Sequence, residues 1–149
     1  NNFTLSELTK SQAAERCGFD NNPDKEQVAS LVLLCEHVLQ PIRDHFQKPV
    51  VISSGYRSPN VSRQIGSSSK SQHCKGQAAD MEIPGISNKE LADFIYENLP
   101  FDQVILEFHN PEEINSGWVH VSYVGDENRY AYLIAERDET GRVRYSKWQ

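Results

Sequence analysis

The stretch "SQHCKGQAADMEI", residues Ser71–Ile83, joins a glycine-containing turn to a segment that looks like a strand. Side chains of a strand point alternately to its two faces, so Asp80 should point away from the apolar residues that flank it. Gly76 permits a tight turn between His73 and Asp80, and small residues leave room for the backbone there. We therefore hypothesise that His73 and Asp80 bind the same metal ion.

Before this stretch, apolar periodicity predicts helices. Residues 4–18 should form one short helix or two successive helical turns that end at Gly18. A longer helix should follow, capped by Asp20 or Asn22, with Pro41 kinking it or ending its first part. Its expected buried stripe consists of Val28, Leu31, Val32, Cys35, Val38, Leu39 and Ile42.

After these helices, short alternating runs predict strands. We expect a short buried strand at 49–54, further strands at 76–83, 101–108 and 117–124, and two final strands within 129–148. A helix with a Ser87–Glu90 capping box should be inserted at 87–100. The order of elements predicts an α+β fold, in which N-terminal helices pack on a mostly antiparallel central sheet.

Alternation along the predicted strands places Asp80, Glu107 and His120 opposite apolar stripes. Buried carboxylates and imidazoles need partners, and one shared metal ion would satisfy them together. Catalytic zinc commonly has three protein ligands and keeps a fourth position for water. His73, Asp80 and His120 would supply two imidazoles and one carboxylate to Zn²⁺, and Glu107 is the candidate general base.

Composition narrows the possible partners. The net charge of −6 argues against nucleic acid or an anionic membrane surface as the main partner. No apolar run is long enough to span a bilayer, and the first residues lack the features of a signal peptide. We expect a monomer that is cytoplasmic or released by lysis, as a phage or prophage lysin would be. The three cysteines form no CxxC pattern, and we expect Cys17 and Cys35 to be buried.

Four separated motifs carry a resemblance to a known family. Ser71-x-His-x-x-Gly-x-Ala-x-Asp80, "DQVILEF", "GWVHVS" and "SGYRSP" at Ser54–Pro59 occur in the order found in the zinc D-Ala-D-Ala carboxypeptidase and L-Ala-D-Glu endopeptidase family. These murein peptidases share their fold with the hedgehog signalling domain. The resemblance covers the chain up to about Tyr123. We expect residues 1–149 to form a single zinc peptidase-like domain.

The resemblance implies a function and roles for individual residues. The function would be zinc-dependent hydrolysis of peptides that contain D-amino acids, such as peptidoglycan stems, by either carboxypeptidase or endopeptidase cleavage. His73, Asp80 and His120 would be the zinc ligands, and Arg57 would bind a substrate carboxylate. Ser71 could assist Arg57 by hydrogen bonding.

One position differs from several members of the family, which place the catalytic acid three residues before the last histidine. Gly117 occupies that position here, whereas Glu107 matches the glutamate of the hedgehog-type arrangement. His109, Glu112 and Glu113 are the alternative bases. The alternative function is a non-catalytic zinc-containing module that binds the cell wall or a peptide.

Overall fold

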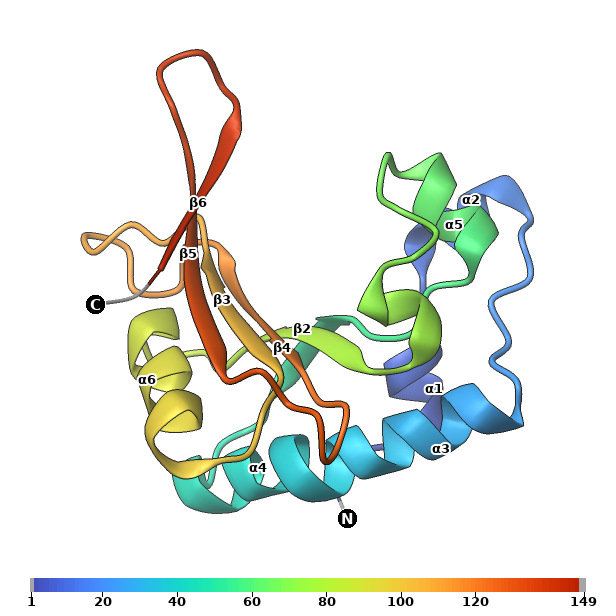
Figure 1. Ribbon diagram of the computed structural model, residues 1–149, viewed down its shortest axis with the longest axis horizontal. Helices are drawn as coiled ribbons and strands as arrows, with labels where there is room; N and C mark the ends of the chain where they lie inside the picture. Colours follow the sequence, from blue (N-terminus) through green and yellow to red (C-terminus); the bar gives the residue numbers. More distant parts are fainter. Residues whose placement is uncertain (1, 148–149) are drawn as a thin grey trace.

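A six-stranded sheet forms the centre of the computed structural model, which describes residues 2–147 (Figure 1). Its strand order is β1-β2-β4-β3-β5-β6; β3 and β5 are parallel, and the other neighbours are antiparallel. The strands are β1 (Val51–Ser54), β2 (Ala78–Glu82), β3 (Gln103–Glu107), β4 (Trp118–Ser122), β5 (Ala131–Arg137) and β6 (Val143–Lys147). The predicted α+β fold is confirmed, and Trp148 lies outside the described residues.

Most helices come before the first strand in the sequence, whereas α5, η2 and α6 lie between strands. They are α1 (Leu5–Thr9), α2 (Gln12–Cys17), α3 (Lys25–Leu34), the π-helical turn η1 (Cys35–Leu39), α4 (Gln40–Phe46), α5 (Pro59–Gln64), the 3₁₀ turn η2 (Gln72–Lys75) and α6 (Asn88–Asn98). Within residues 2–147, every helix is too short or too polar to cross a lipid bilayer.

The start of α3 differs from the prediction. Asp24, rather than Asp20 or Asn22, caps the helix, and it forms a capping box with Gln27. Two reciprocal hydrogen bonds satisfy helix-end donors that a single Asp or Asn upstream would leave unpaired. Pro23 therefore lies before the helix and not within its first turn.

The long helical segment passes Pro41 without ending there. Figure 1 shows α3 and α4 running on from each other, joined by η1. Pro41 has no N–H group to donate to the preceding turn, and the hydrogen-bond pattern widens into a π turn immediately before it. The predicted buried stripe is correct except at Val28, which is half-buried, and Val32, which is exposed; Leu34, outside the stripe, is fully buried.

One face of the sheet packs in the hydrophobic core and the other lines a cavity, as the alternation of side chains predicted. Apolar residues of β2, β3 and β4 point toward α3, α4 and α6 and form the core: Ala79, Met81, Val104, Leu106, Val119 and Val121. Their sequence neighbours point to the opposite face, which includes Asp80, Glu107 and His120. The core thus fixes the strands from one side and leaves the other side for a site.

Two predictions of burial are wrong. The strand β1 lies at the edge of the sheet, and its residues alternate between exposed and half-buried instead of being enclosed on both faces. Cys17 is exposed at the end of the short helix α2, whereas Cys35 is buried as expected. A strand or helix at the periphery has only one neighbour, so its apolar residues cannot all be enclosed.

The N-terminal helices hold two loops of the opposite face in place. The Leu8 carbonyl in α1 accepts a hydrogen bond from the Tyr56 N–H at 2.7 Å. Gly55 passes so close to Leu8 that a Cβ atom there would lie 2.2 Å from the Leu8 carbonyl oxygen. The Gln27 side chain in α3 donates to the Cys74 carbonyl at 3.1 Å. The loop Ser54–Arg57 and the turn η2 are therefore both attached to the helical layer.

A buried carboxylate ties η2 to the far end of the sheet. Asp102 accepts hydrogen bonds from the Gln72 side chain at 2.9 Å and from the Arg129 guanidinium at 2.7 Å. The bonds from Arg129 lower the pKa of Asp102 to about 2, so the carboxylate is ionised throughout the neutral range. Gln72 directly precedes His73, and the network thus restrains the turn that carries this histidine.

Gly117, immediately before β4, occupies a place that a side chain cannot share. Its φ is +68°, and a Cβ atom there would lie 1.8 Å from the Glu107 carbonyl oxygen. Because the obstacle is backbone in a neighbouring strand, no rotamer change can relieve it. With the backbone placed as it is in this chain, position 117 therefore has no room for a catalytic acid.

We predict that Gly117→Ala lowers the free energy of unfolding by about 2–4 kcal/mol, because it adds a steric clash to the cost of a left-handed backbone. Gly18→Ala is the matched control: its φ is also +68°, but a Cβ atom at this position would have no atom within 4 Å. It should cost only about 1–2 kcal/mol. Urea unfolding of both variants measures the difference. Equal losses would show that backbone conformation alone explains the effect.

Candidate metal centre

His73, Asp80 and His120 converge on one point of the open face of the sheet. Each offers a ligand atom, and these atoms all lie within 4.8 Å of one another. His73 comes from η2, Asp80 from β2 and His120 from β4, where Asp80 and His120 are paired across the strands. The antiparallel register of β2 and β4 thus brings together residues that are far apart in the sequence.

The separations of the three groups fit one zinc ion. The Asp80 Oδ1 atom lies 3.4 Å from the His73 Nε2 atom and 3.0 Å from the His120 Nδ1 atom. Two atoms bound to one zinc ion at 2.0–2.1 Å and a tetrahedral angle would lie roughly 3.3 Å apart. The donor set of two imidazoles and one carboxylate is also one that zinc prefers.

The His73 ring is fixed by a backbone carbonyl. Its Nδ1 atom lies 2.7 Å from the Gly55 carbonyl oxygen, so Nδ1 carries the proton of the neutral ring. The Nε2 lone pair then faces Asp80. A hydrogen bond of this kind, opposite the ligating nitrogen, is the usual support of a metal-binding histidine. The close approach of Gly55 to Leu8 therefore orients a candidate ligand.

Asp80 is ionised in this setting. Burial alone would raise the pKa of its carboxyl, but the two imidazoles beside it, His120 first and then His73, outweigh burial and hold the pKa below its usual range. A carboxylate that is deprotonated in the folded protein needs no proton release before it can bind a cation.

Glu107 lies in the same cleft, one strand away from His120. It is paired with Trp118 across β3 and β4, and it lines a cavity of about 370 Å³ together with the three candidate ligands. Burial, and next the negative charge of Asp80, raise the pKa of Glu107, while His120, Trp118 and Arg57 act in the opposite direction. A raised pKa suits a group that must both accept and return a proton near neutrality.

Arg57 also lines this cavity, from the loop after β1. Its backbone N–H donates to the His73 carbonyl at 3.1 Å, which ties the two predicted residues together. Its Nε atom is buried, and within residues 2–147 it has no hydrogen-bond partner. Arg57 lines the cleft, and a guanidinium can donate two parallel hydrogen bonds to a carboxylate.

Ser71 lines the cavity too, but its hydroxyl already has a structural task. The Oγ atom accepts a hydrogen bond from the His73 N–H at 3.2 Å and thereby caps η2. The alternative bases lie elsewhere: His109, Glu112 and Glu113 are not among the residues that line the cavity. Cys74 is buried and is not part of the candidate metal group.

Sequence reasoning missed several residues that line the cleft. Gln103 and Ile105 share the face of Glu107, so alternation alone could have included them. Ser67 and Gln72 come from the loop and turn beside His73. Tyr145 comes from β6 at the far edge of the sheet, and no local signal in the sequence indicates that it would reach the cleft.

Comparison with known proteins gives one positive result. A family model described as Peptidase M15 matches residues 1–122, which include every candidate site residue named in the sequence prediction. No match was found among curated proteins. The matched segment covers most of the chain and contains the zinc-compatible centre. The chain therefore belongs to the peptidase M15 family, a family of zinc-dependent peptidases related to D-Ala-D-Ala carboxypeptidases and hedgehog-like domains.

Proposed function

We propose that this chain hydrolyses short peptides containing D-amino acids, such as peptidoglycan stems, with Zn²⁺ held by His73, Asp80 and His120. One observation carries the proposal: three atoms suited to zinc converge in a cleft that is also lined by an arginine and by a glutamate of raised pKa. Zinc bound there would polarise the scissile carbonyl, lower the pKa of a water molecule and stabilise the oxyanion.

Glu107 is the proposed general base and acid. Its carboxylate accepts a proton from the attacking water and then donates that proton to the leaving amine. It lies on the strand beside His120 and is not a member of the candidate metal group, so its carboxylate is left for proton transfer.

Arg57 is the proposed anchor for a carboxylate on the leaving-group side of the substrate. A guanidinium can form two parallel hydrogen bonds with a carboxylate, and this geometry fixes the distance from the anchor to the scissile bond. Ser71 remains a proposed helper, although its hydroxyl also caps η2. Whether the anchored carboxylate is a chain terminus or a side chain distinguishes carboxypeptidase from endopeptidase cleavage.

The alternative function is a zinc-containing binding module without turnover. Digestion of purified muropeptides with and without a chelator separates the two. An amine that appears with zinc and is lost with the chelator supports the peptidase. Tight binding without a new amine supports the module. The position of Glu107 in the cleft favours the peptidase.

We predict that the purified chain binds one zinc ion and that His120→Ala weakens binding by more than about 100-fold, because changes that only disturb ligand orientation already cost roughly 10–100-fold. Competition titration with a zinc-binding dye measures the affinity. His109→Ala is the control, since this histidine is outside the candidate group. Equal losses in both variants would contradict the assigned ligand.

We predict that Glu107→Gln keeps zinc affinity within about threefold and lowers kcat by roughly 10²–10⁴-fold, because the amide cannot accept the water's proton. Stopped peptide digests analysed by mass spectrometry give kcat, and metal analysis gives zinc content. The control is Glu113→Gln, which changes an exposed loop residue in the same way. Ordinary activity in Glu107→Gln would remove this residue as the base.

We predict that Arg57→Ala lowers kcat/KM by about 10- to 100-fold for a substrate with the anchoring carboxylate, which corresponds to one hydrogen-bonded charge. The same peptide with that carboxylate converted to an amide should be cleaved poorly by both proteins and show little difference between them. Arg63→Ala, an exposed arginine of α5, is the control. A loss of equal size for the acid and the amide would argue against a carboxylate anchor.

A further inference from the structure

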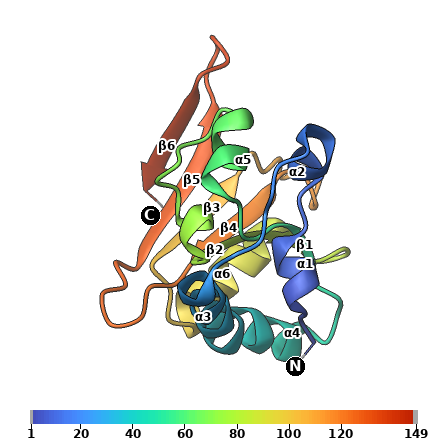
Figure 2. The ribbon, with the colours of Figure 1, turned by 90° about the vertical axis from the view of Figure 1, so that its right-hand side faces the viewer.

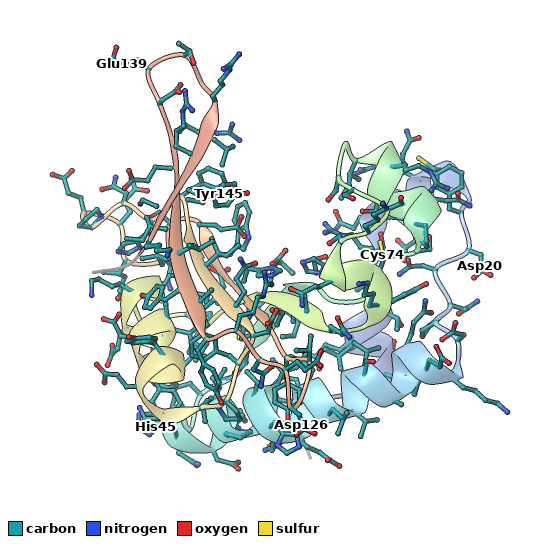
Figure 3. The ribbon with its side chains drawn as sticks, viewed as in Figure 1. Asp20, His45, Cys74, Asp126, Glu139 and Tyr145 are labelled. Atoms are coloured by element: carbon teal, nitrogen blue, oxygen red, sulfur yellow. The ribbon has the colours of Figure 1, made fainter. Side chains whose placement is uncertain are left out.

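The C-terminal hairpin β5–β6 contributes a residue to the cleft, although it lies beyond the segment that matches the family. The match ends at residue 122, and the hairpin covers Ala131–Lys147. Tyr145 of β6 lines the same cavity as His73, Glu107 and His120. In Figure 3, Tyr145 lies on the side of the hairpin that faces the lobe containing Cys74.

Strand register explains how Tyr145 reaches this position. Glu107 is paired with Ala135 across β3 and β5, and Ala135 is paired with Tyr145 across β5 and β6. Paired residues share a face, so these three side chains form one row across the sheet. Ala135 is small and fully buried, so the members of this row that a ligand in the cleft can reach are Glu107 and Tyr145.

The row of Glu107, Ala135 and Tyr145 runs across the sheet in the direction that leads away from Arg57, the proposed carboxylate anchor. Arg57 follows β1 at one edge of the sheet, the candidate zinc ligands lie over β2 and β4, and Tyr145 lies on the opposite edge strand. Figures 1 and 2 show the β5–β6 hairpin and the α2–α5 lobe rising on the same side of the sheet. A peptide with its carboxylate at Arg57 and its scissile bond at the metal would direct its N-terminal part past Glu107 toward Tyr145.

The distance from the candidate metal site sets which substrate residue meets Tyr145. Three strand spacings separate β4, which carries His120, from β6, or roughly 14 Å. An extended peptide advances roughly 3.3 Å per residue, so this distance corresponds to about four residues. The Tyr145 side chain is 57% exposed, and its ring is thus available to a ligand. Burial and the nearby Glu107 charge raise its pKa, which keeps the phenol neutral.

We infer that Tyr145 packs its ring against the substrate residue about four positions before the scissile bond and so favours longer peptides over dipeptides. The inference rests on the proposed peptidase function. Tyr145 is a specificity determinant and takes no part in proton transfer. It would affect KM or the dissociation constant, and leave kcat unchanged.

The test uses N-acetylated peptides that share a C-terminal D-Ala-D-Ala pair and carry zero to three further residues before it. Kinetics are measured with the zinc-loaded full chain, and binding is measured by calorimetry on the Glu107→Gln background, where turnover is blocked. Tyr145→Ala should raise KM and the dissociation constant about 3- to 10-fold for the longest peptide, the value of one aromatic contact. The shortest peptide should change less than about twofold.

Two further variants make the outcome decisive. Tyr145→Phe keeps the ring and should behave as the unchanged chain, which also guards against loss of the hairpin. Tyr130→Ala removes an exposed tyrosine outside the cavity and should show no dependence on peptide length. A Tyr145→Ala effect that is absent, or the same at every length, overturns the inference. An unchanged chain that neither binds nor cleaves any of the peptides overturns the proposed function as well.

Discussion

The pairing of Asp80 with His120 across β2 and β4 is the contact on which the site depends. A slip of one residue in this register would turn Asp80 toward the core and place Met81 on the open face. The carboxylate is largely enclosed, and it is stable there because two imidazoles contact it. The same register aligns the apolar residues that fill the opposite face, so the core and the metal centre support each other.

The third candidate ligand, His73, is positioned by a different layer. His73 receives its orientation from the Gly55 carbonyl, and Gly55 is held against Leu8 of the first helix. On its other side, the turn η2 is attached to α3 through Gln27 and to Asp102 through Gln72. Metal binding would therefore stabilise the contacts between helices and sheet as well as the site itself, since binding energy adds to folding energy when the site forms on folding.

The sequence predicted what depends on local periodicity and missed what depends on distant neighbours. Alternation identified the faces of Asp80, Glu107 and His120 correctly, because each strand has a clear apolar side. It did not show that β1 lies at an edge, or that β5 lies parallel to β3, because strand pairing is set by the whole fold. Tyr145 was missed for this reason: its place in the cleft depends on two successive strand pairings.

The close packing of Gly117 against the backbone of Glu107 decides which of these two positions has room for an acidic side chain. The segment before β4 approaches the end of β3 so closely that Gly117 has no room for a Cβ atom beside the Glu107 carbonyl. An acid three residues before the last histidine, as in several related peptidases, would need that space. Glu107 is paired with Trp118, directly next to Gly117, so the end of β3 brings a carboxylate to the same neighbourhood. The obstacle is backbone, so position 117 excludes a side chain whatever residue stands at 107, and the carboxylate in this neighbourhood is the one at the end of β3.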